Sequence, residues 1–69
     1  MLTTYDEAMR WLREVGGTIT GPAPATDDYS EVVAEAQGIQ RRVLLDGADR
    51  SAVNEAIVEA CNDLRSSLE

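Results

Sequence analysis

Three acidic residues recur at four-residue spacing near the C-terminus, where the sequence predicts a helix. Glu55, Glu59 and Asp63 occupy positions i, i+4 and i+8, with no basic residue on the same line. Like charges at this spacing cost helix stability, and neighbours on such a row lie about 6 Å apart, comparable with the charge spacing of a nucleic-acid strand. The row indicates either an ordinary solvated helix face, which charge runs usually are, or an acidic surface that binds a basic partner.

Other carboxylates cluster outside the predicted helices. Asp27 and Asp28 are adjacent, and Asp46 is followed by Asp49 three residues later. Carboxylate pairs can hold a hard cation or act as acid and base, but neither cluster follows the twelve-residue calcium-loop pattern. Aspartate is also the residue that backbone hydrogen bonding favours in turns and at helix N-caps. The sequence therefore predicts no metal site and no cofactor.

Histidine and lysine are both absent. The lack of histidine excludes imidazole acid–base catalysis, histidine-activated nucleophiles and imidazole metal sites. The lack of lysine excludes Schiff-base chemistry and a P-loop, and the five glycines match no phosphate-binding spacing. Cys61 lies on an apolar helical stripe with no base nearby, which predicts a small buried hydrophobe. We therefore expect a protein that is not an enzyme and that acts by binding.

The chain is strongly acidic. Thirteen Asp and Glu residues stand against six basic residues, all arginine, for a formal charge of -7. A nucleic-acid-binding protein needs a basic stripe, and only Arg41-Arg42 and the pair Arg10 and Arg13 come close to one. We expect no direct nucleic-acid binding. An acidic surface suits a protein partner with a basic surface, or simply keeps a small protein soluble.

The sequence also bears on compartment and size. A single cysteine excludes an internal disulfide and is typical of a reducing compartment. The first residues are acidic where a signal peptide would be basic and then apolar, and no stretch approaches the ~20 apolar residues that span a bilayer. We expect a cytoplasmic protein with no membrane contact. Its 69 residues form one domain, 1–69, with a core thin enough that homodimerisation or a partner would add stability.

Two helices are predicted at the ends of the chain. The first begins at the N-cap Thr4, which forms a capping box with Glu7, and ends at Gly16-Gly17. The second begins after the N-cap Asp49 and carries the clearest periodic signal in the sequence. Its apolar stripe follows helical spacing throughout: Val53, Ala56, Ile57, Ala60, Cys61, Leu64 and Leu68.

The middle of the chain is predicted to form strands. Residues 18–20 are β-branched and predict a short edge strand, and residues 21–24 (GPAP) predict the start of a loop, because proline has no amide donor. Residues 29–46 favour a hairpin turning at Gln37-Gly38, although a helix is the rival interpretation. This turn pairs Val32 with Val43, Ala34 with Arg41 and Ala36 with Ile39 on a core face.

On the outer face of that hairpin, Glu35 comes within diagonal reach of Arg42, and Val33 lies beside Leu44. Arg41 interrupts the core face. Either its stem packs there while the guanidinium reaches water, or it pairs with a helix carboxylate. Trp11 lies beside the apolar stripe of the first helix. We expect it to pack in the core rather than to act as an exposed interface anchor.

Together these patterns predict an α+β fold: a small antiparallel sheet of two or three strands with an N-terminal and a longer C-terminal helix packed on one face, in the order α-β-β-β-α. For function, the leading hypothesis is a non-enzymatic inhibitor that mimics nucleic acid and occupies the basic nucleic-acid-binding surface of a partner protein. Phage-encoded anti-defence proteins have this profile of size and charge. Its predicted binding residues are Glu55, Glu59 and Asp63, with Asp27, Asp28 and Glu31. The alternative is a structural or accessory subunit that pairs through its sheet with itself or with a larger chain.

Overall fold

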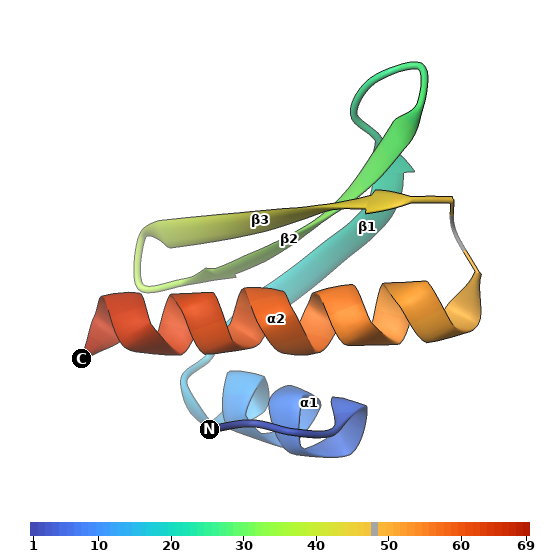
Figure 1. Cartoon of the computed structure of the whole chain (residues 1–69). Helices are drawn as coiled ribbons and strands as arrows, with labels where there is room; N and C mark the ends of the chain where they lie inside the picture. The colour runs from blue at the N-terminus through green and yellow to red at the C-terminus, as the bar shows by residue number, and fades with distance from the viewer. Residues whose placement is uncertain (48) are drawn as a thin grey trace.

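The computed structural model describes residues 1–47 and 49–69. Its elements follow the predicted order α-β-β-β-α (Figure 1). The sheet is antiparallel in the order β1-β2-β3, and both helices lie on the same side of it. The bounds are α1, Tyr5–Glu14; β1, Thr18–Pro24; β2, Tyr29–Ala36; β3, Ile39–Asp46; and α2, Arg50–Leu68.

The predicted capping box at the start of α1 is present. The backbone amide of Glu7 donates to the Thr4 hydroxyl at 3.1 Å, and the Glu7 carboxylate accepts from the Thr3 and Thr4 amides. Hydrogen bonds from the Thr3 side chain, then from the Thr3 and Thr4 backbone, hold the pKa of Glu7 below its ordinary value. At the other end, Gly16 takes a left-handed conformation with φ of 69° and stops the helix, as the sequence predicts.

The central hairpin is confirmed, and its register is the predicted one. Val32 faces Val43, Ala34 faces Arg41 and Ala36 faces Ile39. Gln37 and Gly38 both have positive φ, the geometry of the two-residue turns that match the twist of a hairpin. The alternation of side chains therefore buries the apolar face of β2 toward the helices and leaves its charged face outside.

The first strand is longer than predicted. Sequence reasoning ended it at Thr20, but β1 continues to Pro24 and pairs with β2 on both sides of Gly21-Pro22. Thr20 faces Val33 and Ala23 faces Glu31, so β1 has one extra residue between these pairs, which is a β-bulge. A bulge at a sheet edge accommodates a proline that a regular ladder would exclude, and the prediction of a loop at 21–24 is wrong for this reason.

The core lies between α2 and the sheet. The predicted stripe of α2 is buried from Ala56 to Leu64, and its two ends, Val53 and Leu68, are partly buried. It packs against β2 and β3, and α1 packs chiefly against α2. Trp11 is partly buried against the same core, in line with the favoured interpretation.

The two arginines of β3 differ in detail from expectation. Arg41 is exposed and reaches α2, but its partner is the hydroxyl of Ser67 at 2.8 Å rather than a carboxylate. Arg42 forms an ion pair with Glu31 at 3.5 Å, whereas Glu35 accepts a hydrogen bond from Gln40. Glu31 and Glu35 are the two diagonal neighbours of Arg42, and sheet twist makes the two diagonals unequal.

Cys61 is fully buried, as its place on the stripe predicts, and burial raises the pKa of its thiol from 9.0 to about 11. Because the unfolded chain loses this proton first, the group's contribution to stability falls as pH rises from about 9 toward 11. We expect the native thiol to resist Ellman's reagent at pH 8 and to react fully once denaturant unfolds the protein. Fast labelling of the native protein would contradict the buried placement.

Candidate functional site

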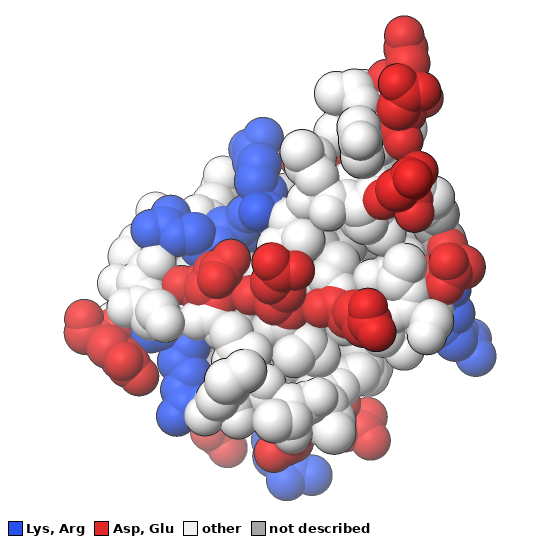
Figure 2. Space-filling view, viewed as in Figure 1, with Lys and Arg blue, Asp and Glu red and all other residues white. Residues whose placement is uncertain are grey.

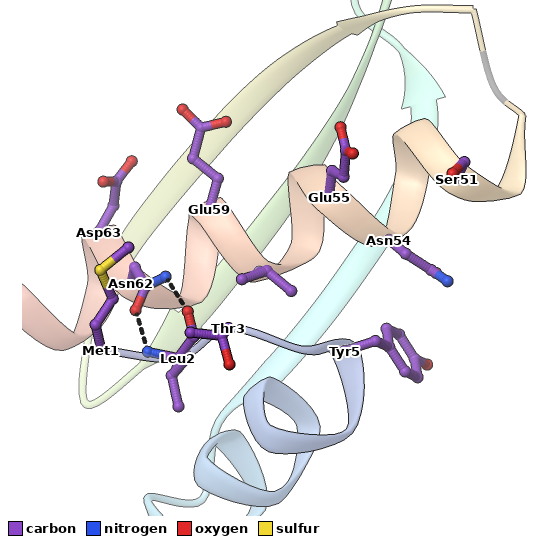
Figure 3. Close-up of a pocket in the computed structure, with 11 residues that line it drawn as sticks. Met1, Leu2, Thr3, Tyr5, Ser51, Asn54, Glu55, Glu59, Asn62 and Asp63 are labelled. Carbon is purple, nitrogen blue, oxygen red and sulfur yellow. Dashed lines mark hydrogen bonds between the residues drawn. The ribbon is translucent and has the colours of Figure 1, made fainter.

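An open groove of about 750 Å³ lies between the N-terminal segment and α2 (Figure 3). Met1, Leu2, Thr3 and Tyr5 line one side. The side chains contributed by α2 recur at i, i+3, i+4, i+7, i+8, i+11 and i+12: Ser51, Asn54, Glu55, Val58, Glu59, Asn62 and Asp63. This is the spacing of one helix face, so α2 has a second lengthwise face beside its buried stripe.

Asn62 fixes the N-terminal segment along α2. Its side-chain oxygen accepts from the Leu2 amide and its side-chain nitrogen donates to the Leu2 carbonyl, both at 2.9 Å (Figure 3). The carboxamide thus satisfies both backbone groups of one residue, as a neighbouring strand would. The Leu2 side chain is buried in the core. The wall of the groove that carries Met1 and Tyr5 is therefore anchored to the helix that forms the opposite wall.

Glu55, Glu59 and Asp63 form the acidic row, and the structure brings all three to the rim of this groove. All three are exposed, and Figure 2 shows a band of carboxylates across the middle of the molecule, with arginines beside the left end of the band. Within the described residues, the ion pairs join Arg42 to Glu31 and Arg65 to Glu69, and neither involves the row. Along about 12 Å of helix, the row therefore presents three carboxylates that form no ion pair with the described residues.

The other predicted binding residues lie elsewhere. Asp27 and Asp28 are exposed in the turn between β1 and β2, where the Asp28 amide donates to the Thr26 hydroxyl. Glu31 is on the outer face of the sheet, and its carboxylate is partly covered by the ion pair with Arg42. None of the three lines the groove. The structure thus separates the six predicted residues into a groove set and a set at the sheet.

Comparison of the chain with protein-family models, with curated proteins and with solved structures finds no match. The site must therefore be interpreted from its own chemistry. Across residues 1–47 and 49–69, no cluster of His, Cys, Asp and Glu is arranged to hold a metal ion. Over the same residues, no helix has the length and apolar character needed to cross a membrane.

Sequence reasoning found the acidic row but missed the apolar part of the groove. Tyr5 is 40% exposed and Met1 is 94% exposed. Val58 lies off the main stripe of α2, between Asn54 and Asn62. The row Asn54, Val58 and Asn62 is otherwise polar, so its one aliphatic side chain is the sequence signal for a second contact face on α2.

Proposed function

We propose that this protein is a non-enzymatic binding protein whose acidic row, Glu55, Glu59 and Asp63, docks on a basic, nucleic-acid-binding surface of a partner protein and so inhibits it. The observation that supports this most directly is the exposure of three carboxylates in one line on α2, none of which forms an ion pair among the described residues. Their separation of about 6 Å resembles that of charges along a nucleic-acid strand, so side chains arranged to bind phosphates can bind them too.

The energetics of the row support the same proposal. Two like-charge pairs at i, i+4 destabilise a helix by about 0.2–0.5 kcal/mol each. Among the described residues no arginine forms an ion pair with the row, so no direct ion pair offsets this cost. A basic partner would offset it, and it would bind faster because of long-range attraction to a chain with a formal charge of -7.

The triple substitution Glu55→Gln, Glu59→Gln and Asp63→Asn tests the proposal. We expect it to raise the free energy of unfolding by about 0.5–1 kcal/mol, because two repulsive pairs disappear. We also expect it to abolish capture of the partner from host lysate. The measurement is a tagged pull-down washed at low and at high salt, combined with thermal melting of both proteins.

The matched control is Glu14→Gln, Glu35→Gln and Asp46→Asn, which removes the same formal charge from exposed positions outside the groove. It should reduce capture far less than the triple substitution in the row. Equal loss with both variants would show that net charge alone drives binding and that the row has no special role. Unchanged capture with the row variant would overturn the proposal.

The alternative function, an accessory subunit that pairs through its sheet, also rests on an observation. Both helices cover the same face of the sheet, and on the other face Leu44 is 56% exposed and Tyr29 is 47% exposed. Partners held by apolar burial are largely indifferent to salt, whereas a charge-driven partner dissociates as salt rises. A salt-resistant partner that is lost with Leu44→Ser and kept with the row variant would favour this function.

A further inference from the structure

We infer that the groove between the N-terminal segment and α2 is the docking site for a basic amphipathic helix of the partner, with the acidic row binding its basic side chains and Val58, Tyr5 and Met1 binding its apolar ones. The inference rests on the proposed function, and it specifies the partner's structure at the contact.

The groove combines two kinds of surface that a purely electrostatic site would not need. Its rim is acidic, but Val58 lies between the two asparagines of its α2 face, and Tyr5 and Met1 face it from the N-terminal segment. Three accessible apolar side chains in one groove give a ligand apolar area to bury as well as charges to pair. In such an interface the apolar centre adds affinity to the attraction that the charged rim supplies.

The dimensions of the groove favour a helical ligand. Its α2 face extends from Ser51 to Asp63, which is about 18 Å along a helix. The side chains of this face form ridges along the helix at i, i+3, i+4 and i+7, and another helix can pack its own side chains between such ridges. A partner helix with basic residues at four-residue spacing would match the acidic row position for position, with apolar residues on the adjoining row to contact Val58.

Charge decides between the possible occupants. A second copy of this chain would place one acidic row against another, and a nucleic acid would place phosphates against it, and both arrangements are repulsive. A basic helix is attracted along the whole rim, and its apolar side chains leave water only when it enters the groove. The groove is therefore complementary to a segment that is basic and apolar at once.

The direct test uses a synthetic alanine-based helical peptide as the probe. It carries arginine at every fourth position and leucine three residues after each arginine, so that the two rows adjoin. The control peptide has the same composition with the leucines moved to the opposite face. We expect ¹⁵N chemical shifts to move at Glu55, Val58 and Asn62, and the control peptide to bind at least about tenfold more weakly. Shifts at Leu44 and Arg42 instead, or none at all, would overturn the inference.

Three variants separate this inference from the proposed function. Tyr5→Ser and Val58→Thr remove apolar contact and leave the charge unchanged, and Leu44→Thr is the matched control on the outer sheet face. We expect each of the first two to weaken peptide binding about five- to tenfold while Leu44→Thr has no effect. If capture of a basic partner depends on the acidic row but not on Tyr5 or Val58, the groove inference is wrong and the proposed function still holds. Peptide binding that is indifferent to salt and to the row would sink both.

Discussion

Replacing Leu64 with alanine is expected to lower the free energy of unfolding by about 2–5 kcal/mol, the range for a buried leucine that leaves a cavity. Leu64 is one of the largest fully buried side chains, and it lies on the buried stripe of α2 that faces the sheet. A chain of this length has a net stability of only about 3–10 kcal/mol. The substitution should therefore remove a large fraction of the protein's stability.

Urea denaturation followed by circular dichroism measures this loss, and Leu44→Ala is the matched control. Leu44 has the same side chain on the outer sheet face, where it is 56% exposed, so its truncation should cost less than about 1 kcal/mol. Equal losses at the two positions would mean that α2 does not pack on the sheet as the structure has it.

Gly21→Ala is expected to destabilise the protein by about 3 kcal/mol for a different reason. Gly21 has φ of 106°, a conformation that side chains with a Cβ rarely adopt. An added Cβ would also contact the Glu31 carbonyl oxygen across the bulge and approach the Val32 Cα at 3.1 Å. Both obstacles are backbone atoms of the neighbouring strand, which cannot move aside as a flexible side chain can. Thermal melting of the purified variant measures the loss.

Gly47→Ala separates conformational strain from crowding. Gly47 also has a positive φ, of 82°, but among the described residues other than its chain neighbours, none has an atom within 4 Å of where its Cβ would be. We expect it to cost about 1 kcal/mol, the strain contribution alone. If Gly21→Ala costs no more than this, the close approach of β1 to β2 at the bulge is not rigid.

The parts of the fold that sequence predicts are those governed by local rules. The hairpin register follows from Gln37-Gly38, because a two-residue turn leaves one pairing, and that pairing places Val32, Ala34 and Leu45 on one face. The ends of α1 follow from Thr4 and Gly16, whose backbone and side-chain preferences act within a single turn. None of these requires knowledge of distant residues.

The parts that sequence does not predict depend on contacts between distant segments. Asn62 binds the backbone of Leu2 across 60 positions, and nothing local in either segment signals the contact. This contact holds the N-terminal wall of the groove against α2. The extension of β1 past Gly21-Pro22 depends on β2 being there to pair with Ala23, and the choice of Glu31 by Arg42 depends on sheet twist. In each case an intrinsic preference is overridden or completed by a tertiary neighbour.

The two edges of the sheet differ in a way that limits how copies of this protein can assemble. The β1 edge carries the bulge and two prolines, each without an amide donor, whereas β3 runs eight residues in unbroken register. Backbone pairing between molecules would therefore use β3 against β3. Such a contact would pair the β3 edge of both copies and leave only their β1 edges exposed. Assembly would therefore stop at a two-fold dimer with a six-stranded sheet, and an open filament would not form.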